Sequence, residues 1–137
     1  MARLVGFRLV DIRRGRSTVE LPAGPQHANP MGTIHGGILC DIADAAMGMA
    51  YASTISPRES FTTIELKVNF LRPFWTGRIS AHGRVLRKGR TIGLVECRLK
   101  DGEGRLVAFA TSTCLTIAGS AEDGIRRPRR PVRSRRE

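Results

Sequence analysis

The sequence predicts an α+β domain in which one long helix is covered by an antiparallel sheet. Residues 34–53 have the length of a helix, are rich in alanine and methionine, and are small or apolar on almost every side. Residues 61–117 instead form short alternating runs separated by turns, which is typical of an antiparallel meander. A helix that is apolar all round has to be buried, so we expect the sheet to curve around it.

The remaining elements follow from turn signals. Two short strands are expected before the helix, at 5–12 and 16–21, on either side of the turn Arg13-Arg14-Gly15. A loop rich in Pro, Gly, Asn and His then runs from Pro22 to Thr33. After the helix, strands are expected at 62–70, 78–87, 91–100 and 105–117, with turns at Lys88-Gly89 and Asp101-Gly102. Alternation in the first of these strands places Thr63 on its polar face, beside Glu65 and Lys67.

Length and charge bound the organisation of the chain. With 137 residues we expect one domain at 1–119, followed by a disordered Arg-rich tail at 120–137. Residues 126–137 contain seven Arg and one Glu, so they carry +6 of the net charge of +11. The tail could hold phosphates, RNA or an acidic partner, but a solubilising role is the favoured interpretation. Nucleic acid is therefore not the expected partner.

The composition also indicates a compartment and argues against a metal. No window approaches the roughly 20 apolar residues of a membrane span, and the N-terminus lacks a signal-peptide core. We therefore expect a cytoplasmic protein that does not contact a membrane. Three separated cysteines without CxxC spacing and three scattered histidines indicate neither disulfides nor a metal site, and no cofactor is expected.

The start of the helix carries the candidate site. Two acids, Asp41 and Asp44, interrupt an otherwise apolar helix. Burying a carboxylate there costs free energy unless it has a functional role or a paired partner. The glycine pair Gly36-Gly37 leaves backbone N–H groups open to an incoming oxygen. Together these features indicate a site for attack on a carbonyl compound.

The same residues resemble a known family. Asn29-Pro30-x-Gly32-x-x-His35-Gly36-Gly37, followed by Asp44 and a small-residue helix, is similar to the hotdog-fold thioesterases, and more narrowly to acyl-CoA thioesterases of the phenylacetate-degradation type. Phe70-Leu71-Arg72-Pro73 and Arg87-Lys88-Gly89-Arg90 are similar to a strand end and a turn of that family, and the resemblance covers roughly residues 18–117. It implies a homodimer, usually paired into a homotetramer, with the active site between subunits. Asn29 and Gly36 would come from one subunit, and Asp44 and Thr63 from the other.

The resemblance also implies an activity, the hydrolysis of short, medium or aryl acyl-CoA thioesters. The Gly36 N–H would stabilise the oxyanion, and Asp44 would act as general base or as nucleophile, both of which remain open. Asp41 is the competing acid, but the spacing from His35 favours Asp44. Cys40 is rejected as the nucleophile because no histidine is spaced to serve it.

Secondary roles and one alternative complete the prediction. Asn29 could orient the water or the carbonyl, His35 could support the loop or touch substrate, and Thr63 could hold the attacking water. The phosphates of coenzyme A call for a basic rim, for which the candidates are Arg72, Arg87, Lys88 and Arg90. The alternative is a hotdog domain that binds an acyl thioester without hydrolysing it, as a sensor or a carrier-protein partner. A hydratase on this fold would need an acid–histidine arrangement that the sequence does not show.

Overall fold

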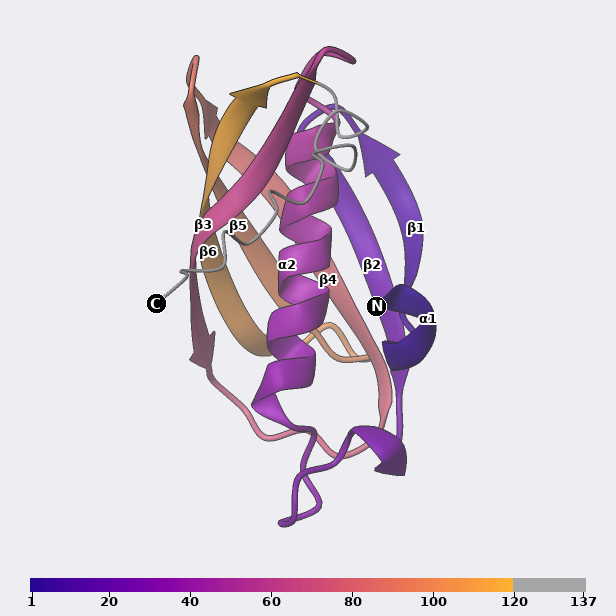
Figure 1. Ribbon diagram of the computed structural model, residues 1–137. Coiled ribbons are helices and arrows are strands. Elements are labelled where there is room, and N and C mark those ends of the chain that lie inside the picture. Colours follow the sequence, from indigo (N-terminus) through magenta and orange to yellow (C-terminus); the bar gives the residue numbers. More distant parts are fainter. Residues whose placement is uncertain (120–137) are drawn as a thin grey trace, which may run out of the picture.

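The computed structural model describes residues 1–119, so the predicted tail lies outside the described residues. A six-stranded sheet, all of it antiparallel, has the strand order β1-β2-β4-β5-β6-β3. The long helix α2 lies across its concave face (Figure 1), which confirms the predicted α+β architecture. The elements are α1 (Ala2–Val5), β1 (Arg8–Arg13), β2 (Arg16–Ala23), a 3₁₀ turn (Pro25–His27), α2 (Gly36–Ala52), β3 (Glu59–Phe70), β4 (Gly77–Lys88), β5 (Ile92–Lys100) and β6 (Leu106–Ala118).

Local chemistry fixes both the start of α2 and its distance from the sheet. His35 is the N-cap, and its Nδ1 accepts a hydrogen bond from the Gly37 N–H at 2.9 Å. Further along, the Ser17 hydroxyl of β2 donates to the Ala46 carbonyl at 2.6 Å. Gly83 of β4 faces the same carbonyl, and any side chain there would overlap with it. The helix can therefore lie directly on β2 and β4.

The helix is not covered on every side. Its sheet-facing residues, among them Ile42, Met47 and Tyr51, are fully buried, whereas Met49 on the other side is 39% exposed. The neighbouring edge strand β3 also exposes Ile64, which is 54% accessible. An apolar helix face beside an apolar strand edge is a typical surface for a second copy or another partner.

The structure corrects the predicted boundary of the first strand. Residues 2–5 form a short helix that ends at Gly6 in the left-handed conformation (φ 90°), and the strand begins only at Arg8. An apolar run of this length fits a helical turn as well as a strand, so periodicity alone could not separate them.

The predicted orientation of Thr63 is also wrong. A β-bulge shifts the register of β3, so that Thr63 pairs with Cys114 while Glu65 pairs with Thr113, and Ile64 is the extra residue. Thr63 therefore faces α2 instead of sharing the polar face with Glu65. Strict alternation cannot reveal a bulge, which adds one residue to one strand.

None of the helices formed by residues 1–119 is long and apolar enough to cross a membrane.

Candidate active site

Asp44 lies on the side of α2 that faces the edge strand β3, and it is half-buried. The Thr63 hydroxyl donates a hydrogen bond to its Oδ1 at 3.0 Å. Within residues 1–119, no hydrogen bond or ion pair engages the other carboxylate oxygen. One oxygen of the acid is thus fixed while the other is available to a proton or an electrophile.

The thiols near this acid and near the helix start are poor nucleophiles. Burial raises the pKa of Cys114, which lies behind the Asp44–Thr63 pair, and the negative charge of Asp44 acts in the same direction. Burial and the neighbouring Asp41 raise the pKa of Cys40 as well. Both groups remain thiols near neutral pH, which agrees with the sequence-based preference for an acid over Cys40.

A groove of about 400 Å³ opens beside the start of α2. Gly36 is part of its wall, and a Cβ at this position would lie 2.9 Å from Cζ of Phe70. The Gly37 N–H is bonded to the His35 ring and the Ile38 N–H to the His35 carbonyl. Within the described residues, no hydrogen bond uses the Gly36 N–H, so it is free to meet an oxygen in the groove. The apolar part of the wall comprises Ile34, Leu39, Phe70, Leu71 and Phe74.

Asn29 lines the same groove but already holds the loop together. Its Nδ2 donates to the Thr33 hydroxyl at 2.8 Å, and its Oδ1 accepts the Met31 N–H at 2.9 Å. One amide hydrogen and one lone pair remain for a ligand. The neighbouring His35 is exposed and caps the helix.

One chain does not bring all the predicted residues together. Gly36 and Asp44 are eight positions apart on α2, which corresponds to about 12 Å along the helix axis. The groove contains Asn29 and Gly36 but neither Asp44 nor Thr63. The residues therefore form two clusters, divided in the same way as the resemblance divides them between two subunits.

The four predicted basic residues are divided too. Arg72 lines the groove at the start of α2, whereas Lys88 lies near its other end, over the ring of Tyr51 at 5.5 Å. The Lys88 ammonium donates to the Gly89 carbonyl at 2.9 Å, and Arg87 and Arg90 flank it in sequence. Within one chain they do not form a single rim.

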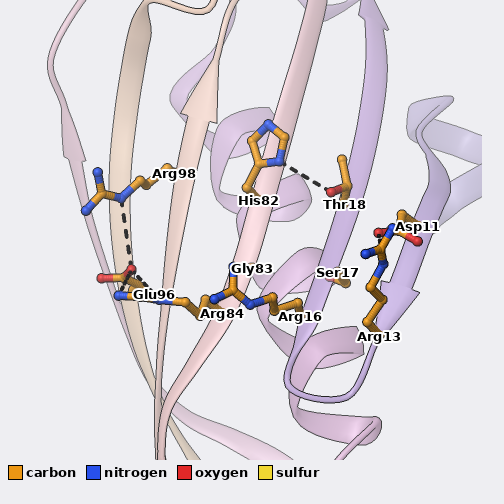
Figure 2. Close-up of a pocket in the computed structure, with 10 residues that line it drawn as sticks. All are labelled: Asp11, Arg13, Arg16, Ser17, Thr18, His82, Gly83, Arg84, Glu96 and Arg98. Atoms are coloured by element: carbon orange, nitrogen blue, oxygen red, sulfur yellow. Dashed lines mark hydrogen bonds and ion pairs between the residues drawn. The ribbon is translucent and has the colours of Figure 1, made fainter.

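Sequence reasoning missed two features. The first is the pair of phenylalanine rings in the groove, one of which, Phe70, the fold brings against Gly36. The second is a hollow of about 480 Å³ lined by arginines on the outer face of the sheet, shown in Figure 2. Strand register creates this hollow, and single-strand patterns do not contain register. Among residues 1–119, no group of three or more His, Cys, Asp or Glu could hold a metal ion.

A long helix wrapped by a curved antiparallel sheet defines the hotdog class of fold. The model of the thioesterase superfamily matches residues 31–108, and the chain belongs to this superfamily.

Known proteins agree with this assignment. The chain is 36% identical over 108 residues to a protein of Saccharolobus solfataricus named as a candidate esterase, covering 79% of this chain and 76% of the relative. It is 24% identical over 109 residues to the 1,4-dihydroxy-2-naphthoyl-CoA hydrolase of Listeria monocytogenes, covering 80% and 89%. A solved structure from Ralstonia eutropha, described as a candidate thioesterase related to phenylacetic acid degradation, has a TM-score of 0.77 and 30% identity, covering 83% of this chain and 87% of that one. These matches confirm the predicted resemblance and support thioester hydrolysis as the class of activity.

Proposed function

We propose that the protein hydrolyses acyl-CoA thioesters with aryl or short-to-medium acyl groups, releasing the free acid and coenzyme A. The observation that carries this proposal is the half-buried Asp44 carboxylate, fixed at one oxygen by Thr63 and open at the other. The apolar part of the groove wall, which includes two phenylalanine rings, suits an aromatic or medium acyl group. The named relatives of this chain that act on a naphthoyl thioester or relate to phenylacetic acid point the same way.

In the proposed reaction the thioester oxygen accepts the Gly36 N–H at the positive end of α2, where negative charge is favoured. Asp44 either removes a proton from water as the water attacks the carbonyl carbon, or attacks that carbon itself to form an anhydride that water opens. In both routes the carbon–sulfur bond breaks and coenzyme A leaves. Asn29 and His35 would support the loop that presents Gly36.

The proposed active unit is a homodimer, itself paired into a homotetramer. The open face of α2 and the exposed apolar edge of β3 would pack against the partner, which would place the Asp44 cluster of one chain against the groove of the other. The four predicted basic residues, Arg72, Arg87, Lys88 and Arg90, would then contribute to binding the phosphates of coenzyme A.

The primary test is release of free thiol from acetyl, hexanoyl, palmitoyl, phenylacetyl and benzoyl coenzyme A. Asp44→Asn should abolish turnover on the preferred thioester. Asp41→Asn is the matched control, since it removes an acid three residues away on the same helix, and it should retain turnover. If Asp44→Asn turns over like the wild type, the proposed mechanism is wrong. Binding of a thioester without turnover by the wild type would favour the sensor or carrier-partner alternative.

The oxyanion donor has its own test at Gly36, the first residue of α2. Proline is well tolerated at this helix position, and the extended backbone of His35 (ψ 134°) is compatible with a following proline. Gly36→Pro removes the N–H, while Gly36→Ala adds the same first carbon against Phe70 but keeps the N–H. We expect kcat to fall by about 100-fold or more for Gly36→Pro relative to Gly36→Ala. Equal rates for the two variants would exclude this donor.

A further inference from the structure

The outer face of the sheet, opposite α2, carries a hollow that the proposed hydrolysis does not use. It measures about 480 Å³ and is formed by residues of β1, β2, β4 and β5 (Figure 2). The Ser17 side chain points inward to the Ala46 carbonyl of α2, so its neighbours Arg16 and Thr18 point to the opposite face. The sheet thus separates this hollow from Asp44.

Strand register places three arginines side by side in the hollow. Arg13 lies directly opposite Arg16, and Arg16 lies directly opposite Arg84 on the next strand. Neighbouring strands are about 4.8 Å apart, and like charges at directly opposed positions are destabilising. Negatively charged groups near this row of arginines would relieve the repulsion between them.

The acids of the hollow compensate the two ends of the row but not its middle. Oε1 of the nearly buried Glu96 accepts hydrogen bonds from Arg84, with an N–O distance of 2.9 Å to its terminal nitrogen, and Arg98 approaches the same oxygen at 4.0 Å. At the other end, Arg13 pairs with the exposed Asp11 at 3.2 Å. Between them, Arg16 forms no ion pair with any acid in residues 1–119.

We infer that this hollow is a second binding site, for a small anion that carries phosphate groups, held by Arg16 with Arg13 and Arg84 on either side. The guanidinium fork matches phosphate oxygens in pairs, and it recognises them better than a point charge would. The hollow has the volume of a small-molecule site, and its lining residues are mostly arginines and other charged or polar types, so a compact anion fits it better than an apolar segment of a protein. At one side, the Thr18 hydroxyl and His82 Nδ1, 3.3 Å apart, offer contacts to an uncharged part of the ligand.

The test is a calorimetric titration of the full chain, once with inorganic pyrophosphate and once with ADP, which measures the affinity for each. Arg16→Gln removes the middle of the row and should weaken both affinities by about tenfold or more. Arg78→Gln is the matched control, because Arg78 is exposed on the same face of β4, six residues from Arg84 and thus about 20 Å away. It should bind like the wild type. The Arg-rich residues 126–137 and the proposed thioester site are identical in all three proteins, so their background binding cancels.

His82 gives a readout confined to the hollow. Burial and the nearby Lys100 hold the pKa of His82 below its usual value, with Glu20 acting in the opposite direction. In NMR titrations of the wild type, pyrophosphate should shift the His82 ring signals and raise this pKa, and in Arg16→Gln it should do neither at the same concentration. Arg13→Gln, at the exposed end of the row, should show a smaller loss of affinity.

The two probes separate the sources of the phosphate. Equal affinities for the two probes would show that the site recognises the phosphate groups alone. Tighter binding of ADP would show that the ligand is a nucleotide. Both results support the site. Unchanged affinity in Arg16→Gln, or His82 signals that do not respond to pyrophosphate, would overturn it. The outcome is independent of thioester turnover, so it stands or falls separately from the proposed hydrolysis.

Discussion

Thr63 and Asp44 form a side-chain contact that the catalytic proposal depends on. The hydroxyl of Thr63 holds one carboxylate oxygen at 3.0 Å and so aims the other. Thr63→Val keeps the shape of the side chain but removes the donor. A hydrogen bond to a charged group contributes about 1.5–3 kcal/mol, so we expect kcat/KM to fall by about tenfold to 100-fold.

The controls for this prediction lie at the same place in the strand. Thr63→Ser retains the hydroxyl and should recover most of the rate, and Thr62→Val changes the exposed neighbour on the opposite face and should have no effect. Wild-type kinetics of Thr63→Val on the preferred thioester would show that the contact does not serve the reaction.

Residue types in this site were predictable, but their contacts were only partly so. The spacing from His35 selected Asp44 over Asp41, and in the structure Asp44 has a hydroxyl partner across from it. The orientation of Thr63 was not predictable because it depends on a bulge. The contacts of Asn29 with its own loop are typical of asparagine in turns, where the side chain bonds the neighbouring backbone.

Cys97 provides a test of the core at the residue scale. Burial, together with the charge of neighbouring Glu96, raises the pKa of Cys97 to about 12, so at about pH 8 roughly one molecule in ten thousand would carry the reactive thiolate. Iodoacetamide should therefore leave Cys97 unmodified in the native protein and label the partly exposed Cys40 first, as measured by peptide mass spectrometry. Both should react in urea. Labelling of Cys97 at the rate of Cys40 would mean that the sheet opens readily.

At the scale of elements, the sequence predicted the helix and every strand to within a few residues. The helix expected at 34–53 spans Gly36–Ala52, and the alternating runs after it are β3 to β6. Strong periodicity and glycine turns made this possible. The order of strands in the sheet was not predictable. β3 is the neighbour of β6 in the sheet although β4 and β5 lie between them in sequence, so the pairing depends on contacts distant in sequence.

The packing of α2 on β4 leads to a prediction at the same scale. Gly83 has no side chain because the Ala46 carbonyl occupies the space, so Gly83→Ala must push the helix away from the strand. Overpacking of this kind costs about 1–3 kcal/mol in the free energy of unfolding, measured by urea denaturation. Gly102→Ala, where nothing lies within 4 Å of the added carbon, is the control and should change stability by less than about 0.5 kcal/mol. Equal stability of the two variants would contradict close contact between helix and sheet.

For the whole molecule, the sequence indicated that the helix needs a cover, and the structure shows where the cover is incomplete. The sheet buries Ile42 and Tyr51 but leaves Met49 open beside the apolar edge of β3. In the proposed dimer, the split of the predicted site into two clusters would have the same origin, since a site shared by two chains cannot assemble within one. Local sequence patterns do not encode a partner or its orientation, because both depend on how the surfaces of two folded chains fit together.

Mixed dimers test whether the site is shared. An Asp44→Asn chain keeps the Gly36 cluster, and a Gly36→Pro chain keeps the Asp44 cluster, so a dimer containing one of each would have one intact site and one doubly altered site. Each variant alone should be inactive. When the two are unfolded together and refolded, random pairing of a symmetric dimer should restore about a quarter of the wild-type thioesterase rate. Chains carrying different affinity tags allow the mixed dimer to be purified, and two tagged Asp44→Asn chains serve as the control that stays inactive. A purified mixed dimer without activity would place the reaction within a single chain and would leave the open face of α2 without the role proposed for it.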